Sequence, residues 1–244
     1  MSGINKKSLW VGLCLVVLIS VAGIGIFFLN QKKPGIVIDQ SVSFPETFHF
    51  FELGANTNLN LSIRNKLEEE LGSEAMQTWG YLDIPKLQKE FIQNHFPAFD
   101  QLLGFFYPDS TINTVNDIIH LTYRYATKKK QPFYYVRLSF SKFNNKPLFF
   151  QIQSTKDAAY LLDVLLQKYG KPIINQEVVK QATLSAWEFN QDILILTRVP
   201  NRFAEIEFHV TICYTNNMQQ CINKLQQQLI LNKKQIQDAA SKAF

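Results

Sequence analysis

Hydrophobic and polar positions alternate with a period of two through much of the second half of the chain. Between Val115 and Ile152, three runs place an apolar residue at every second position, and Asn144-Asn145 marks the turn between the last two. Such alternation is typical of β-strands that turn one face to a core, so it predicts an antiparallel meander. The same pattern returns after residue 180 in the segments Leu184–Phe189, Ile193–Arg198 and Phe203–Tyr214.

Helical spacing of apolar residues predicts helices before, between and after these strands. The segment Pro85–Leu103 is interrupted at His95-Phe96-Pro97, which indicates two short helices. Another helix is expected between Ser154 and Gly170. The apolar stripe of the last helix, which continues more weakly to Ile236, consists of Met218, Cys221, Ile222, Leu225 and Leu229.

Two interpretations of this last stripe stay open. It is a face that packs on the sheet, or it is a seam through which copies of the chain form a homo-oligomer. In either case, the order of elements predicts an α+β fold. Its antiparallel sheet would consist of two β-meander plus helix units, with the helices packed on one face.

A shift of 60 residues places the two expected units on each other. It superposes Leu148, Phe150 and Ile152 on apolar positions of the last strand, and it also superposes the apolar stripes of the two following helices. Residue identity between the units is poor. An ancestral duplication and two independent units with the same packing rules are both compatible with the match.

The N-terminal segment has neither of these periods. Leu9–Leu29 contains no charged residue, and as a helix it is about 31 Å long, which matches the hydrocarbon core of a bilayer. It therefore predicts a single transmembrane helix that holds the chain in a lipid bilayer. A signal peptide cleaved at Ser20-Val21-Ala22 is the alternative. Lys6, Lys7 and the N-terminal amine favour a cytoplasmic N-terminus, with the domain exported across the cytoplasmic membrane.

These boundaries divide the chain into an anchor and one folded domain, which we expect to be periplasmic or otherwise extracytoplasmic. The expected parts are a short leader 1–8, an anchor 9–29, a juxtamembrane linker 30–60 and a soluble domain 61–244, with a helical part 61–110 and a sheet-helix part 115–244.

The charge distribution does not favour a nucleic-acid partner. The chain has 25 basic and 20 acidic residues, and the basic excess is concentrated beside the anchor. The remaining chain is nearly neutral and lacks the basic footprint of a nucleic-acid-binding domain. The basic residues that flank the anchor are Lys6, Lys7, Lys32 and Lys33.

Catalytic signatures are absent from the sequence. It contains no Gly-rich phosphate loop, no His-Glu-x-x-His, no Cys-x-x-Cys and no nucleophile elbow. We therefore predict neither a cofactor nor a metal centre. An enzyme would need a histidine as general base, with His95 or His120 beside Asp100 or Asp117.

Candidate binding residues lie on strand faces that point away from the apolar side. Two aromatic residues at such positions are either covered by a second layer or exposed as a binding patch. On the last strand, three polar residues alternate on one face, where neighbours are nearly 7 Å apart, so a solvated surface is favoured over a metal site. The candidates are Tyr135, Phe149, Glu205, Glu207 and His209.

The function that agrees with this organisation is that of a membrane-anchored, non-enzymatic component of the cell envelope. A tether confines the domain near the membrane and raises its effective concentration for partners assembled there. We therefore expect the domain to bind a protein or cell-wall partner. An anchored hydrolase of envelope polymers is the alternative.

Overall fold

The structure is a computed structural model and describes residues 47–108, 110, 114, 116–155, 158–179 and 181–243. The predicted anchor, Leu9–Leu29, lies outside these residues. Within the described ranges, no helix has the combination of length and apolar character that is needed to cross a membrane.

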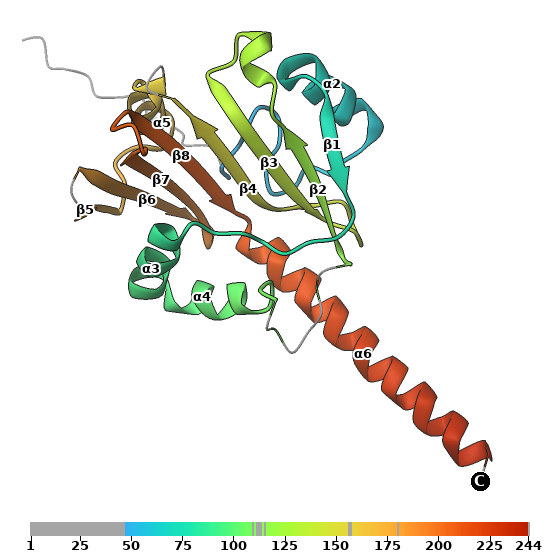
Figure 1. Cartoon of the computed structure of the whole chain (residues 1–244). Helices are drawn as coiled ribbons and strands as arrows, with labels where there is room; N and C mark the ends of the chain where they lie inside the picture. Colours follow the sequence, from blue (N-terminus) through green and yellow to red (C-terminus); the bar gives the residue numbers. More distant parts are fainter. Residues whose placement is uncertain are drawn as a thin grey trace, which may run out of the picture. The chain divides into compact units, whose positions relative to one another are not determined.

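An antiparallel sheet of eight strands forms the centre of the fold (Figure 1). Its strand order is β1-β2-β3-β4-β8-β7-β6-β5, so a meander of four strands makes up each half. The α+β fold and the antiparallel sheet predicted from the sequence are thereby confirmed. The strands are β1 Glu74–Gln77, β2 Ile118–Tyr123, β3 Phe133–Ser141, β4 Pro147–Ser154, β5 Ile174–Val179, β6 Ala182–Phe189, β7 Asp192–Pro200 and β8 Ile206–Cys213.

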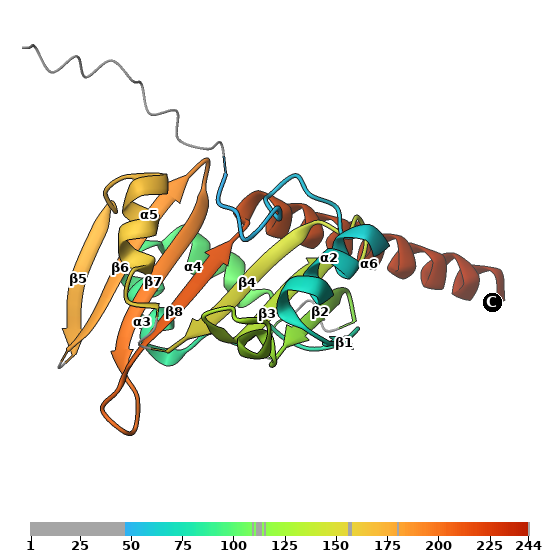
Figure 2. The same cartoon turned by 90° about the horizontal axis from the view of Figure 1, so that it is seen from above.

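Helices cover both faces of the sheet, not one face as predicted (Figure 2). One face carries α2, α5 and the segment before α2, and the other carries α3, α4 and the first part of α6. The pattern missed the second layer because it assumes that polar strand positions face water. The helices are α2 Leu61–Leu71, α3 Lys86–His95, α4 Pro97–Gly104, α5 Leu161–Tyr169 and α6 Thr215–Ala243, and a 3-10 turn, η1, spans Ala126–Lys129.

Each face of the sheet has its own hydrophobic core. Phe150 and Tyr214 lie in the core under α2 and α5, whereas Phe91 and Leu103 lie in the core under α3 and α4. Phe149, a predicted outward residue, belongs to this second core and is 1% exposed. The second layer therefore covers Phe149.

A β-bulge at the start of β4 changes the face of one predicted core residue. Ser139 pairs with Phe149 and Phe140 pairs with Pro147, which leaves Leu148 between the two pairs without a partner. An extra residue of this kind shifts the alternation by one position. Leu148 consequently packs in the second core, and the prediction that it shares a face with Phe150 is wrong.

The two units related by the 60-residue shift meet at the middle of the sheet. β4 and β8 are antiparallel neighbours, and Phe150 pairs with Ile212. Two antiparallel neighbours are exchanged by a two-fold rotation about an axis perpendicular to the sheet. Such a rotation would keep the helices that follow the two strands on the same face of the sheet. However, α5 and α6 lie on opposite faces, so the match does not extend to the complete units.

The sequence pattern missed both edge strands and placed one helix start too early. β1 and β5 are mostly exposed and rich in polar residues, so neither shows a clear alternation. α5 begins at Leu161 and not just after Ser154, which is the last residue of β4. Gly170 ends α5 as predicted, with a φ of 76°.

The described part of the predicted linker, residues 47–60, packs into the first core. Phe48 and Leu53 are buried there, and the Tyr214 hydroxyl lies 3.1 Å from the Phe48 carbonyl oxygen and 3.2 Å from that of Leu53. The backbone N–H of His49 donates to the Tyr169 hydroxyl at 3.0 Å. This segment runs between α5 and α2 and is part of the folded unit (Figure 2).

Candidate functional site

A tight turn in the segment before α2 holds an aromatic side chain in an unfavourable backbone conformation. Phe50 and Leu53 exchange two backbone hydrogen bonds of 3.0 Å, so Phe51 and Glu52 form the loop between them. Phe51 has a φ of 50°, which costs a residue other than glycine about 1–2 kcal/mol. Two-residue loops usually place Gly, Asn or Asp at such a position. Phe51 is nevertheless 40% exposed.

α2 lies beside this turn because both of its ends are well defined. The Asn60 side chain accepts a hydrogen bond of 2.9 Å from the Ile63 N–H at the start of the helix, and Gly72 follows its last turn. Leu67 and Leu71 turn the helix toward the first core.

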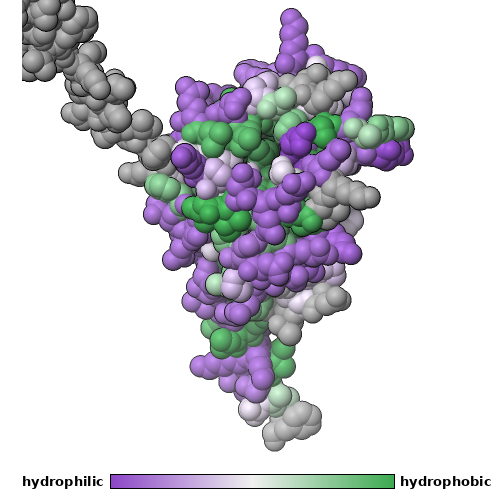
Figure 3. Space-filling view, turned by 90° about the vertical axis from the view of Figure 1, so that its left-hand side faces the viewer, coloured by the Kyte–Doolittle hydropathy of each residue, from purple (hydrophilic) through white to green (hydrophobic). Residues whose placement is uncertain are grey.

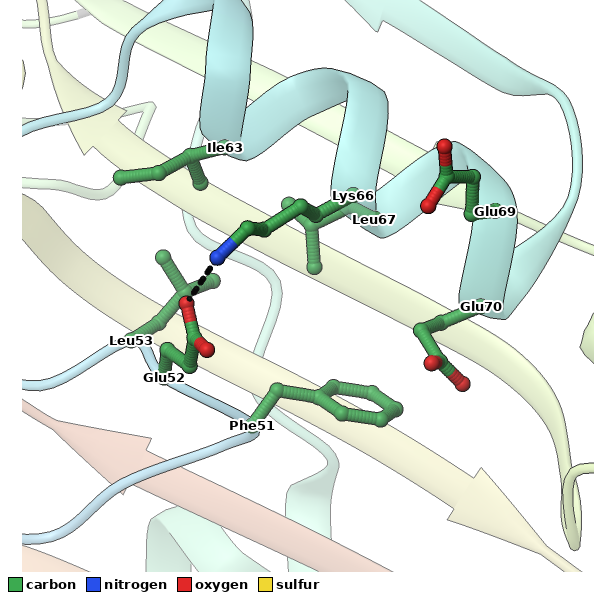
Figure 4. Close-up of a pocket in the computed structure, with 8 residues that line it drawn as sticks. All are labelled: Phe51, Glu52, Leu53, Ile63, Lys66, Leu67, Glu69 and Glu70. Atoms are coloured by element: carbon green, nitrogen blue, oxygen red, sulfur yellow. Dashed lines mark hydrogen bonds and ion pairs between the residues drawn. The ribbon is translucent and has the colours of Figure 1, made fainter.

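The turn and α2 enclose a groove of about 300 Å³, which we call the α2 groove (Figure 4). Its floor is apolar, and its rim carries three carboxylates and one ammonium group. The residues of the floor are Phe51, Leu53, Ile63 and Leu67, and those of the rim are Glu52, Lys66, Glu69 and Glu70.

The rim of the α2 groove has an excess of negative charge. The single cation, Lys66, pairs with Glu52 at 2.9 Å, but both side chains are largely exposed, so the pair contributes little stability. Glu70 accepts a hydrogen bond of 2.8 Å from Gln131. Glu69 has no hydrogen-bond or ion-pair partner in the part of the chain that the structure describes.

Two features of the groove oppose local stability. Phe51 carries backbone strain and exposes an aromatic ring. Glu69 and Glu70 lie at the C-terminal end of α2, where the helix dipole disfavours negative charge. Departures of this kind concentrate at functional sites. An apolar floor with an acidic rim fits a ligand that combines an apolar side chain with a cationic group.

We expect the backbone strain at Phe51 to appear in the free energy of unfolding. Phe51→Gly and Phe51→Ala both remove the ring, but only glycine adopts a positive φ without steric cost. The glycine variant should therefore be more stable than the alanine variant by about 1 kcal/mol. Urea unfolding of the compact unit 44–244 measures this difference. Equal stabilities, or a more stable alanine variant, would show that the backbone at Phe51 is not strained.

The structure brings two predicted binding residues, Glu207 and His209, into one polar cluster. Tyr134 donates its hydroxyl to Glu207 at 3.2 Å, the Asn201 side-chain amide donates at 3.0 Å, and His209 Nε2 lies 3.3 Å from the carboxylate. Burial alone would raise the pKa of Glu207, but the hydrogen bonds from Asn201, His209 and Tyr134 outweigh burial and lower that pKa. The cluster is largely satisfied internally.

Of the remaining predicted residues, Tyr135 lies near this cluster and Glu205 lies in the loop that precedes β8. Tyr135 is half-buried and pairs across the sheet with Gln153, which pairs in turn with His209. Glu205 is exposed, and its backbone N–H donates to the Asn201 side chain at 3.0 Å. Among the described residues, no group of three or more His, Cys, Asp or Glu side chains is placed to hold a metal ion.

His95, one of the two histidines proposed for a hydrolase, has a neutral partner. Its Nε2 lies 2.8 Å from the side-chain oxygen of Gln176 on β5. Asp100 occupies the first turn of α4, where its charge suits the helix dipole. No hydrogen bond or ion pair between His95 and Asp100 occurs in the described structure.

His120, the other histidine, is fully buried. Its Nδ1 lies 2.8 Å from the Ser139 hydroxyl. Burial and the nearby positive charge of Arg137 lower the pKa of His120 to about 4. The side chain is thus neutral near pH 7 but out of contact with solvent. Burial also raises the pKa of Asp117, and the charge of Lys142 partly opposes that effect.

A second, polar cavity of about 520 Å³ lies at the start of α6 and contains a buried carboxylate. Asp192 accepts hydrogen bonds from the Thr215 backbone N–H at 2.9 Å and from the Thr47 hydroxyl at 3.4 Å. Burial raises the pKa of Asp192 to about 6, although these hydrogen bonds oppose the shift. Because Asp192 caps α6 from the neighbouring strand β7, its position has a structural explanation.

Sequence reasoning missed the α2 groove. Its aromatic member lies in a segment that the sequence predicts as a linker, and its glutamates resemble an ordinary solvated helix face. One signal was present: the run Phe48-His49-Phe50-Phe51 is too apolar for a simple linker.

These features define an α+β protein with a sheet covered on both faces and an exposed groove of mixed apolar and acidic character. Comparisons with protein-family models, with curated proteins and with solved structures give no match.

Proposed function

We propose that this protein is a membrane-anchored, non-enzymatic component of the cell envelope whose domain binds a partner protein. The α2 groove holds a segment of that partner in which an apolar side chain is flanked by Lys or Arg. The domain lies on the outer side of the cytoplasmic membrane, and Leu9–Leu29 spans the bilayer.

The observation that carries the proposal is the conformation of Phe51. A bulky residue at a positive φ lowers stability, and its ring remains available at the edge of an apolar groove. A partner side chain placed on Phe51 and Leu67 would remove this apolar surface from water. That contact would recover part of the free energy that the strain costs.

Charge adds specificity to this apolar contact. Glu69 and Glu70 lie on the rim beside Phe51, and the exposed pair between Lys66 and Glu52 is weak enough to rearrange. A cationic side chain of the partner would pair with the glutamates and relieve their unfavourable position at the end of α2.

The anchor explains how a small groove can suffice. A groove of about 300 Å³ buries a few side chains, so the intrinsic affinity for a free partner would be modest. A tether that keeps both proteins at the same membrane raises their effective concentration and compensates for weak binding.

Site-specific photocrosslinking tests the proposal. The full chain carries p-benzoylphenylalanine in place of Phe51, and the matched control carries it in place of Phe203, which is also an exposed phenylalanine but lies in the loop before β8. We expect a discrete crosslinked partner from position 51 in the membrane fraction and none from position 203. The same products at both positions, no product at position 51, or products only in the soluble fraction would contradict the proposal.

The acidic rim is tested in the same experiment. The double variant Glu69→Gln/Glu70→Gln should lower the yield at position 51 by about tenfold, because two exposed ion pairs contribute about 1–2 kcal/mol together. Glu90→Gln, an exposed glutamate on α3, is the control and should leave the yield unchanged. An unchanged yield in the double variant would remove the acidic rim from the proposal.

A further inference from the structure

The second half of α6 has no packing partner within the described chain. α6 has 29 residues, and its buried residues all lie between Asn217 and Leu225. Every residue from Gln226 to Ala243 is exposed, and Figure 1 shows this part of the helix extending away from the sheet. In proteins, most of the stability of a helix comes from packing of its apolar face against another element.

An apolar seam continues from the buried half of α6 into the exposed half. Met218, Ile222 and Leu225 contact the second core, and the spacing of alternately three and four residues continues beyond them. Leu229 is 51% exposed and Ile236 is 71% exposed. Hydrophobic side chains are visible on the narrow end of the molecule in Figure 3. The exposed seam consists of Leu229, Asn232, Ile236, Ala239 and Ala243.

We propose that a second copy of this chain covers the seam, and that the exposed halves of the two α6 helices pair side by side. The seam is narrow, because its residues recur at alternate spacings of three and four along one side of the helix, and Asn232 is its single polar member. Gln226, Gln228 and Gln235 flank the seam, so most of its borders carry no charge that would repel an identical helix.

A membrane surface fits the exposed helix less well than a second helix does. Helices that lie on a membrane have a wide, bulky apolar face opposite a strongly basic face. Here the seam ends in alanines, and glutamine predominates on the polar side. Full overlap of two such helices buries about 1,000 Å² in total, which is close to the lower limit for a specific interface.

Steric exclusion determines the direction of the pair. The body of each copy covers the start of its own seam, so in a parallel pair the two bodies would occupy the same space. An antiparallel pair places the bodies at opposite ends and sets large seam residues against small ones. Across the interface, Leu229 lies opposite Ala239 of the second copy, and Ile236 lies opposite Asn232.

The mass of the purified full chain tests the pairing. In mild detergent, with the detergent mass subtracted, light scattering should give twice the mass of one chain for the unaltered protein. Leu229→Asp and Ile236→Asp should each return it to the mass of one chain. The matched control is Ile230→Asp, because Ile230 is 68% exposed but lies off the seam, and this variant should remain a dimer. A single-chain mass for the unaltered protein, or equal masses for all three variants, would overturn the pairing.

Disulfide crosslinking tests its direction. In a Cys14→Ser background, with the native Cys213 and Cys221 buried, the double variant Leu229→Cys/Ala239→Cys should form covalent dimers on mild oxidation. Neither single variant should do so, because in the antiparallel pair neither position faces itself. Covalent dimers from Leu229→Cys alone would overturn the antiparallel arrangement, as would no dimers from the double variant.

Discussion

Replacing Phe150 by alanine is expected to destabilise the folded unit by about 3–5 kcal/mol. Phe150 is fully buried at the centre of the sheet, where its ring centroid lies 5.5 Å from that of Phe140 and 5.2 Å from that of Tyr214. The substitution removes apolar contact area and leaves a cavity that the surrounding strands fill only in part. A loss of this size is a large share of the stability of an ordinary domain.

Denaturant unfolding of the compact unit 44–244 measures this loss, and Phe203→Ala provides the matched control. Phe203 is 69% exposed, so its truncation should change the free energy of unfolding by less than about 0.5 kcal/mol. Similar losses at the two positions would mean that Phe150 does not occupy the core.

Replacing His120 by asparagine is expected to make the folded unit less sensitive to acid. Between about pH 7.5 and about pH 4.5, the unaltered protein should lose about 2–3 kcal/mol more stability than the His120→Asn variant. The folded-state pKa of His120 is about 4, below its ordinary value of about 6.5. As the pH falls through this window, the unfolded chain binds a proton at His120 before the folded chain does. The stability is therefore complete above about pH 6.5 and is lost as the pH falls toward 4.

Asparagine suits this test because it does not titrate and its side chain can still hydrogen bond to Ser139. Asp192, with a raised pKa, acts in the opposite direction over the lower part of the window, but it is present in both proteins and cancels in the comparison. The control is Phe203→Ala, which removes an exposed side chain that does not titrate, and its pH dependence should match that of the unaltered protein. Unchanged acid sensitivity in His120→Asn would show that His120 is not the buried titrating group.

The central strands were predictable because each buries apolar residues at alternate positions. β8 shows this most clearly: Phe208 and Val210 are buried, whereas Glu207 and His209 are only half-buried. The helix boundaries at Pro97 and Gly170 were predictable for an equally local reason. Proline lacks the N–H that a helix interior needs, and glycine readily adopts the positive φ that ends a helix.

The candidate site was not predictable in the same way. The α2 groove forms where Phe51 and Leu67 meet, and these residues belong to elements that no local pattern relates to each other. The strain at Phe51 depends on the hydrogen bonds between Phe50 and Leu53, and both of these residues are held in the first core by segments distant in the sequence. Neither the approach of Phe51 to Leu67 nor the turn between Phe50 and Leu53 produces a recognisable pattern in the sequence.

By itself, the sequence determined the identity of most strands and helices, the antiparallel sheet and the apolar character of Leu9–Leu29, because all of these depend on neighbouring residues. Only the tertiary structure decided that helices cover both faces, that Phe149 and His120 are buried, and that half of α6 stands exposed. The physical reason is that alternation distinguishes two faces of a strand but does not say what lies on either. Burial of the second face depends on contacts between distant segments, which only the folded chain brings together.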